Sequence, residues 1–499
     1  MFPNELTAHE TASRVAKGEV SAVSVAEACL NRIEALDPVL HAFIRVDPEG
    51  ALRMAEAVDE KIRRGEKPGP LAGVTVALKD NLCVRGREIT CGSKILRGFI
   101  APYDATVVEK LRSAGAVFLG QTNMDEFAMG SSNENSSYGP ARNPWDPGRV
   151  PGGSSGGSAA GLAADETISA LGSDTGGSIR QPAALCGVAA MKPTYGLVSR
   201  YGLIAYASSL DQIGPFGKDV EDIALLLETI SGHDPRDSTS APVSVPRFRD
   251  FLADDIRGMT LGVPRECFAE GMEAEVERTF REAIKICESL GARVKEIELR
   301  HIPYTLACYY ILSTAEASSN LARFDGVKYG FRAEGAKNLL SLYEATRGAG
   351  FGDEVKRRII LGTYVLSSGY YEAYYARALK VRRLIKNDFD AAWGASCDCI
   401  LMPTSPTVAF QVGEKTADPL RMYLSDVFTI AVNLAGLPAI SIPCGFSSAG
   451  LPVGLQIIAP AFEEGRILKT AYAFEKSTDF HLRKPLRQNS KSQIPNLKS

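Results

Sequence analysis

The sequence predicts an α/β fold in which a β-sheet is covered by helices on both faces. Short apolar runs of strand length alternate along the chain with segments whose apolar residues recur at helical spacing. The 499 residues are 45% hydrophobic and 23% charged, which is enough apolar content to bury a large core. A chain of this length would ordinarily form two or three domains, although no clean linker divides it.

The predicted helices rest on apolar periodicity and on capping residues. The N-terminal pattern over 7–36 is broken near Gly18, and a Pro-Gly-Pro run at 68–70 ends this lead-in. Asp104 is expected to cap a helix that Gly115 then ends. The expected helices cover residues 7–36 in two pieces, 51–64, 104–114, 159–164, 220–231, 273–290, 370–392 and 466–475.

The predicted strands are short, continuous apolar runs, as expected for strands buried on both faces. They cover residues 74–79, 116–120, 168–172, 187–191, 259–263, 399–402, 434–443 and 453–458. Pro and Gly interrupt the last two runs well short of the roughly 20 apolar residues that a membrane-spanning helix needs. The sequence therefore predicts no membrane span.

Charge and cysteine usage narrow the class of protein. A net charge of -3 argues against this chain alone gripping a nucleic acid, since such proteins usually have a basic face. The exception is residues 481–499, which carry five Lys or Arg and no acidic residue and are expected to be a disordered tail. Ten scattered cysteines without a signal peptide predict reduced, buried thiols in a cytoplasmic protein. Cys397 and Cys399 alone are weak evidence for zinc, and we expect no metal.

The densest glycine and serine content lies between Gly148 and Arg180. Two clusters, at 152–161 and 173–180, flank one apolar segment. Neither has the spacing of a P-loop or of a dinucleotide-binding loop, and no lysine follows either of them. A flexible linker is the structural alternative, but a predicted helix and a predicted strand follow the first cluster. Glycines this dense instead indicate close approach of the backbone to a ligand.

Ser178 is the candidate nucleophile of this stretch. It follows a Thr-Gly-Gly turn whose backbone N–H groups would face a developing oxyanion. The usual base is histidine, but none of the five histidines lies near the clusters in sequence: they are His9, His41, His233, His301 and His481. A Ser-His-Asp triad stays open, because triad members can be distant in the chain. Lys79, at the end of an apolar strand, is the better candidate, since a buried lysine loses its proton readily.

Three motifs together resemble the amidase-signature family: residues 76–81, 152–158 and 172–180. The resemblance implies a large mixed sheet and a triad in which Ser178 is the nucleophile and Lys79 the terminal base. Ser154, on a non-proline cis peptide, would bridge them. It further implies support from Ser155 and Asp174. The oxyanion hole would be formed by the backbone of Thr175, Gly176, Gly177 and Ser178.

Longer runs extend the resemblance over residues 4–478 to the glutaminase subunits of heterotrimeric tRNA-dependent amidotransferases. They lie at 124–132, 138–145, 315–323 and 366–371. This implies glutamine as substrate, with Arg358 binding its carboxylate and Asp426 its ammonium group. Tyr309 or its neighbour Tyr310 would lie beside the substrate, with Tyr309 favoured.

The same resemblance implies the organisation and the partners. Residues 1–480 would form a single domain with a helical lead-in (1–70), the catalytic core motifs (71–220) and a helical specificity region (304–395). B and C subunits would complete the heterotrimer, and the misacylated tRNA would bind through the B subunit. This chain would need no cofactor, and ATP and Mg²⁺ would be used by the B subunit.

Two alternatives remain at this stage. A stand-alone amidase acting on small or lipid amides would share the three core motifs, although a lipid amidase usually carries an apolar membrane-binding segment. A catalytically silent scaffold would be expected to lack one of the triad residues, and all three are present here.

Overall fold

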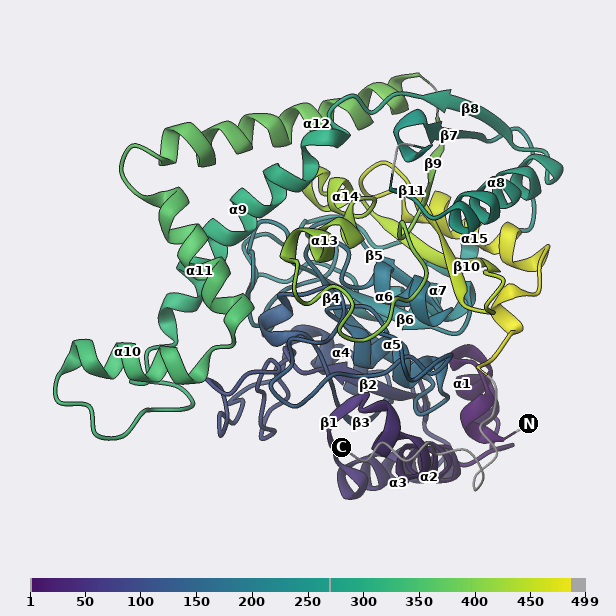
Figure 1. Ribbon diagram of the computed structural model, residues 1–499. Coiled ribbons are helices and arrows are strands. Elements are labelled where there is room, and N and C mark those ends of the chain that lie inside the picture. The colour runs from purple at the N-terminus through teal and green to yellow at the C-terminus, as the bar shows by residue number, and fades with distance from the viewer. Residues whose placement is uncertain (1, 269–270, 396, 486–499) are drawn as a thin grey trace.

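The computed structural model describes residues 2–268, 271–395 and 397–485. Within these ranges, an 11-stranded sheet runs through the molecule (Figure 1). In spatial order its strands are β1 (Phe43–Val46), β3 (Val117–Thr122), β2 (Thr75–Lys79), β4 (Ser169–Asp174), β6 (Gln212–Gly217), β5 (Ala189–Lys192), β10 (Ala439–Phe446), β11 (Pro452–Ile458), β9 (Cys399–Pro403), β7 (Thr260–Pro264) and β8 (Arg293–Ile297).

The sheet is mixed. Strands β3, β2 and β4 are parallel to one another, as are β9, β7 and β8, and the remaining neighbours are antiparallel. Strands β2, β3 and β4 are buried along their whole length, as parallel strands covered on both faces must be. The expected α/β fold with a large mixed sheet is confirmed.

Fifteen α-helices accompany the sheet within the described ranges. They are α1 (Ala8–Ala16), α2 (Ala22–Leu40), α3 (Pro48–Arg63), α4 (Thr106–Ser113), α5 (Gly156–Ala163), α6 (Arg180–Cys186), α7 (Val220–Ile230), α8 (Ala274–Ser289), α9 (Thr305–Asn320), α10 (Leu339–Gly350), α11 (Asp353–Leu366), α12 (Ala376–Gly394), α13 (Pro419–Tyr423), α14 (Ile430–Ala435) and α15 (Glu464–Lys476). In Figure 1, α1 to α3 lie at the β1 end of the sheet, and α9 to α12 form a helical layer along one flank. None of the helices in the described ranges is long and apolar enough to cross a membrane.

Most predicted elements form close to their expected positions. Three strands of the sheet were not predicted, and each has a physical reason. Strand β6 contains Gly214 and Pro215, which are poor strand formers. Strand β8 is a largely exposed edge strand with three charged residues, so it gives no apolar run. Strand β1 has only four residues. These three strands lie outside the predicted set.

Two predictions about element ends are wrong. Helix α4 begins at Thr106, with Ala105 at its N-cap and no side-chain cap. Asp104 instead accepts a hydrogen bond from the Arg85 backbone N–H at 2.7 Å. The strand expected over 434–443 begins only at Ala439, because its first two residues complete α14.

The structure also tests the predictions for the cysteines and for the start of the basic tail. All ten cysteines are buried and free of disulfides, as expected. The basic tail begins with an ordered contact, since Lys484 Nζ lies 2.8 Å from Asp165 Oδ1. Residues 486–499, the rest of that predicted tail, lie outside the described residues.

Candidate active site

Lys79 lies at the carboxyl end of β2, completely buried. Because β4 runs parallel to β2, its last residues reach the same edge of the sheet. The Lys79 Nζ atom there lies 2.7 Å from Ser154 Oγ and 2.8 Å from Ser155 Oγ. It also lies 3.0 Å from Ser173 Oγ and 3.3 Å from the Ser173 carbonyl oxygen. The structure thus brings Lys79 together with Ser154 and Ser155, two of the three serines that the family resemblance singles out.

The environment of Lys79 favours its neutral form. Burial lowers the pKa of Lys79 from 10.5 to about 7, although nearby carboxylates, Asp125 foremost, oppose the change. Four oxygen atoms surround Nζ, one more than the three N–H donors of an ammonium group. A neutral amine has a lone pair that accepts a hydrogen bond, and the Ser154 hydroxyl at 2.7 Å is placed to donate one.

Ser154 follows a cis peptide bond after Gly153, as the family resemblance implies. A side chain at Gly153 would overlap the Asp125 carboxylate, so only glycine fits there. The Asp125 N–H donates to the Ser154 carbonyl oxygen at 3.2 Å. Helix α5 begins directly after Ser155, which fixes both serines at the amino end of a buried helix.

Ser178 lies in the turn between β4 and α6 and is 7% exposed, whereas Ser154 is fully buried. The Ser155 N–H donates to the Ser178 carbonyl oxygen at 3.2 Å, which joins the two glycine clusters. In the described residues no hydrogen bond links the hydroxyl groups of Ser178 and Ser154. The structure therefore shows the Lys79–Ser154 link of the expected relay directly and places Ser178 beside it.

The turn before α6 presents free N–H groups. Within the described residues the backbone N–H groups of Thr175, Gly176 and Ser178 make no hydrogen bond. The Gly177 N–H, also expected in the oxyanion hole, instead donates to Asp174 Oδ1 at 2.8 Å. Gly177 has a φ of 143°, a conformation that favours glycine. Three of the four expected donors are thus available to an oxyanion in this structure.

Asp174 supports this turn through its carboxylate. That group also accepts the Ile179 N–H at 3.2 Å and a two-pronged hydrogen bond from Arg180 at 3.0 and 3.1 Å. Burial raises the pKa of the Asp174 carboxyl, but the Arg180 guanidinium outweighs burial and brings that pKa down to about 2. Asn433 donates to the same carboxylate at 2.9 Å. Asp174 therefore shapes the turn as a permanent anion.

Arg358, on α11, is 3% exposed and is enclosed by aromatic rings. Its Nε donates to Glu354 Oε1 at 2.8 Å and its Nη1 to the Tyr206 hydroxyl at 2.7 Å. The rings of Tyr206, Tyr310 and Tyr423 lie with their centroids 5.2 to 5.7 Å from the guanidinium carbon. Its Nη2 makes no hydrogen bond within the described part of the chain.

The two neighbouring tyrosines have different positions. Tyr310 stacks on Tyr423 with 3.9 Å between ring centroids and lies against Arg358. Tyr309 lies beside the oxyanion turn, because its hydroxyl is 2.8 Å from the position that a Cβ on Gly176 would take. Of the pair, Tyr309 is the one at the turn, and Tyr310 is the one against Arg358.

Asp426 lies on the other side of the same turn. Its Oδ2 accepts a short hydrogen bond from Ser131, whereas Oδ1 is buried and has no partner among the described residues. This free oxygen is 3.2 Å from the position that a Cβ on Gly177 would take. Burial raises the pKa of the Asp426 carboxyl to about 7. Asp426 Oδ1 is therefore free to accept a hydrogen bond beside the turn.

Several residues of this site give little signal in the sequence. Ser131, Tyr206 and Glu354 hold Asp426 and Arg358 through hydrogen bonds. Ser131 and Tyr206 come from segments distant from their partners in the chain, so only the fold brings them together, whereas Glu354 lies one helical turn before Arg358 on α11. Ser173 lies within one of the three family motifs, and its place beside Lys79 follows from its position at the end of β4.

No histidine joins the network. Among the described residues, hydrogen bonds connect His9 to Asp222 and His301 to Asp388, and none connects a histidine with Lys79, Ser154 or Ser178. The geometry thus gives no support to the Ser-His-Asp alternative.

Comparisons with known proteins agree with this geometry. The family model described as Amidase matches residues 24–468. The A subunit of the Glutamyl-tRNA(Gln) amidotransferase of Carboxydothermus hydrogenoformans is 60% identical over 480 residues, which cover 96% of this chain and 99% of that protein. The protein of the same name from Syntrophus aciditrophicus is 60% identical over 482 residues, covering 97% of this chain and 99% of its own length.

Solved structures show the same likeness. The crystal structure of the Glutamyl-tRNA(Gln) amidotransferase A subunit from Thermotoga maritima is 46% identical with a TM-score of 0.80, and 95% of each chain is covered. A 6-aminohexanoate cyclic dimer hydrolase is 27% identical with a TM-score of 0.85, covering 97% of this chain and 99% of that one. From the family model and these relatives, the chain belongs to the amidase family.

Proposed function

We propose that this chain is the glutaminase subunit of a tRNA-dependent amidotransferase. It hydrolyses glutamine and supplies ammonia for converting Glu-tRNA(Gln), Asp-tRNA(Asn) or both into their amidated forms. The observation that carries the proposal is a buried lysine–serine network and a free Asp426 oxygen beside one turn, to which the Arg358 guanidinium is connected through Tyr206 and Asp211. The names of relatives 60% identical over nearly the whole chain support glutamine and the tRNA-linked reaction.

Acylation begins with neutral Lys79. Lys79 takes the proton of Ser154, which takes that of Ser178, while Ser178 Oγ attacks the side-chain amide carbon of glutamine. The negative charge that develops on the amide oxygen faces the free N–H groups of Thr175 and Gly176. Removing one such donor costs roughly 3–4 kcal/mol of transition-state stabilisation in other hydrolases.

The same relay then runs in reverse. The proton returns from Lys79 through Ser154 to the leaving nitrogen, the C–N bond breaks, and ammonia departs from a γ-glutamyl ester on Ser178. Water attacks that ester and gives its proton to the relay. The ester C–O bond breaks, which releases glutamate and restores the Ser178 hydroxyl.

Substrate recognition uses the two charges of the amino acid. Arg358 receives the glutamine carboxylate through its remaining N–H donors, which form strong charge-assisted hydrogen bonds. Asp426 Oδ1 receives the ammonium group, and Tyr309 lies against the substrate beside Gly176. A buried, unpaired carboxylate oxygen is costly unless a ligand satisfies it.

The proposal includes the rest of the assembly. B and C subunits complete a heterotrimer in the cytoplasm, and the misacylated tRNA reaches the reaction through the B subunit. This chain uses no cofactor of its own, and ATP and Mg²⁺ are used by the B subunit. The net charge of -3 supports leaving the tRNA to a partner.

The test measures glutamate released from glutamine by the full chain, alone and co-expressed with candidate B and C subunits in the presence of charged tRNA. Release that rises sharply with the partners, and that disappears in Ser178→Ala while the melting temperature is retained, is expected. Retained glutamine hydrolysis in Ser178→Ala would remove Ser178 as nucleophile.

A stand-alone amidase is the competing function. The 27% identical cyclic dimer hydrolase shares the fold over nearly the whole chain. Strong hydrolysis of other small amides by the lone chain, without any response to the partners, would replace the amidotransferase proposal with this one.

A further inference from the structure

The segment 206–211, here called the recognition arm, connects the two halves of the proposed glutamine site. Asp211 is 2% exposed, and its Oδ1 accepts the Thr175 hydroxyl of the oxyanion turn at 2.7 Å. Its Oδ2 accepts the Tyr206 N–H at 2.9 Å. The hydroxyl of Tyr206 in turn accepts Arg358 Nη1 at 2.7 Å. One aspartate thus joins the oxyanion turn to the residue that orients Arg358.

Helices α9 and α12 also hold the recognition arm through hydrogen bonds. Asn320, the last residue of α9, donates to the Tyr206 carbonyl oxygen at 3.1 Å. Glu316, also on α9, accepts the Ser209 N–H at 2.8 Å, and Arg382 on α12 donates to the Ser209 carbonyl oxygen at 2.9 Å. Helix α9 also carries Tyr309, which lies against the oxyanion turn. The arm, α9 and the turn therefore form a closed ring of contacts.

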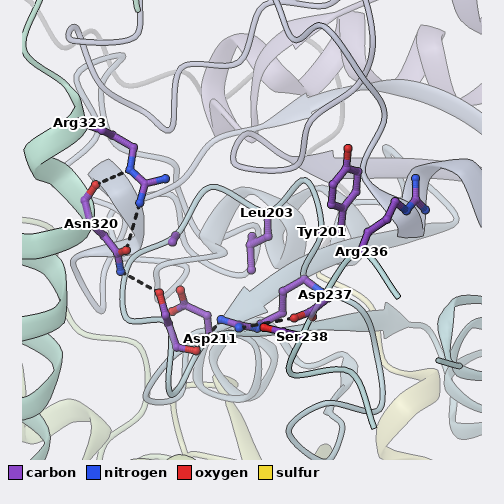
Figure 2. Close-up of a pocket in the computed structure, with 11 residues that line it drawn as sticks. Tyr201, Leu203, Asp211, Arg236, Asp237, Ser238, Asn320 and Arg323 are labelled. Atoms are coloured by element: carbon purple, nitrogen blue, oxygen red, sulfur yellow. Dashed lines mark hydrogen bonds and ion pairs between the residues drawn. The ribbon is translucent and has the colours of Figure 1, made fainter. Parts of the chain in front are cut away.

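A cavity of about 270 Å³ lies behind the arm. Figure 2 shows Asp211 on its wall, with Asn320 and Arg323 on one side and Tyr201 and Arg236 on the other. Tyr206, Ala207 and Leu210 of the arm are buried in the main hydrophobic core, so apolar packing and the hydrogen bonds described above together fix the position of the arm. Loss of a hydrogen bond made by Asp211 or Tyr206 should therefore shift its partner, Thr175 or Arg358.

We propose that the recognition arm sets the position of Arg358 relative to the oxyanion turn, and that Tyr206 and Asp211 are positioning residues for glutamine. Tyr206 acts on recognition of the substrate carboxylate, through Arg358. Asp211 acts on the reacting amide as well, through Thr175. The arm thereby selects amides that carry a carboxylate at the distance found in glutamine. This inference rests on the proposed function.

Two nearly isosteric variants test the hydrogen bonds at the two ends of the arm separately. Tyr206→Phe removes the acceptor for Arg358, so we expect the KM for glutamine to rise roughly tenfold while kcat stays within about twofold. Thr175→Val removes the bond to Asp211 and keeps the backbone N–H, so kcat is expected to fall roughly tenfold with little change in KM. If the arm had a purely structural role, Tyr206→Phe would not change KM alone and Thr175→Val would not change kcat alone.

Tyr201→Phe is the matched control. Tyr201 lines the same cavity, its ring packs against Arg236, and its hydroxyl makes no hydrogen bond within the described ranges. This variant is expected to keep both constants. A double-mutant cycle adds Arg358→Ala, in whose background Tyr206→Phe should have no further effect on KM, because the hydroxyl acts through the guanidinium.

All variants are made in the full chain and assayed for glutamate release with the candidate partner subunits, with melting temperatures measured alongside. An unchanged KM in Tyr206→Phe, or an equal KM rise with and without Arg358, would overturn the inference while wild-type glutamate release keeps the proposed function. Absence of glutamate release by the wild-type complex would instead remove the proposed function, and the inference with it.

Discussion

The protonation of Lys79 controls the proposed reaction, and changing the pH is the direct perturbation. Burial holds the pKa of Lys79 at about 7. With that pKa, the neutral fraction of Lys79 rises from about one tenth near pH 6 to about nine tenths near pH 8. Because only the neutral amine accepts the serine proton, kcat for glutamine should rise roughly tenfold over this interval.

Other groups titrate in the same interval and must be separated from Lys79. Burial also brings the pKa of Asp426 to about 7, and its ionised form binds the substrate ammonium. This second titration affects kcat/KM, whereas kcat at saturating glutamine reports groups in the complex. The carboxyl groups near Lys79 whose negative charge raises its pKa are those of Asp125, Asp174 and Asp211.

The assay is steady-state glutamate release at saturating glutamine across the interval, with Lys79→Arg as the matched variant. Arginine keeps the positive charge and cannot give up its proton, so activity should fall by about 10²–10⁴-fold at every pH. A kcat that is flat or falls from about pH 6 to about pH 8 would refute a neutral Lys79 as the base. Substantial activity in Lys79→Arg would refute it as well.

The remaining predictions concern substrate recognition and the support of the turn. Arg358→Ala and Asp426→Asn should each raise the KM for glutamine by roughly 10–100-fold with a smaller change in kcat, because each removes a charge-assisted contact. An unchanged KM would take the residue out of the site. Asp174→Asn should lower the free energy of unfolding by about 3–5 kcal/mol, measured by denaturant titration, because fully buried Arg180 loses its counter-charge. The folded-state pKa of Asp174, about 2, lies below its ordinary 3.8. Its contribution is therefore present above about pH 4 and is lost as the pH falls toward 2, where variant and wild type should converge. A constant difference down to that pH would contradict the ion pair.

The elements around Lys79 could be predicted because local signals agreed with the fold. Continuous apolar runs mark β2 and β4, and the glycine clusters mark the turns at their ends. Parallel pairing of these two strands then brings Lys79 and Ser173 to the same edge. Strand β6 escaped prediction because glycine and proline weaken its local preference, and its buried place between β4 and β5 stabilises it instead.

The contacts of the proposed recognition residues could not be predicted from the sequence and are seen only in the fold. Arg358 follows from the family resemblance, but nothing near it in sequence indicates that Tyr206, 152 residues away, orients it. The same holds for Ser131, which bonds Asp426 from 295 residues away. The engagement of the Gly177 N–H by Asp174 is also a matter of three-dimensional geometry, although only three residues separate them. Sequence motifs indicate which residues act, and the structure adds which atoms are free to act.

Detection of the covalent intermediate tests the central claim most directly. The full chain with its candidate partners would be mixed with glutamine, quenched in acid within the first turnover, digested and examined by mass spectrometry. A γ-glutamyl ester on the peptide that contains Ser178, present in wild type and missing from Ser178→Ala, is the predicted result. Glutamate release without any such ester, or an ester on another residue, would contradict a mechanism in which Ser178 is the nucleophile.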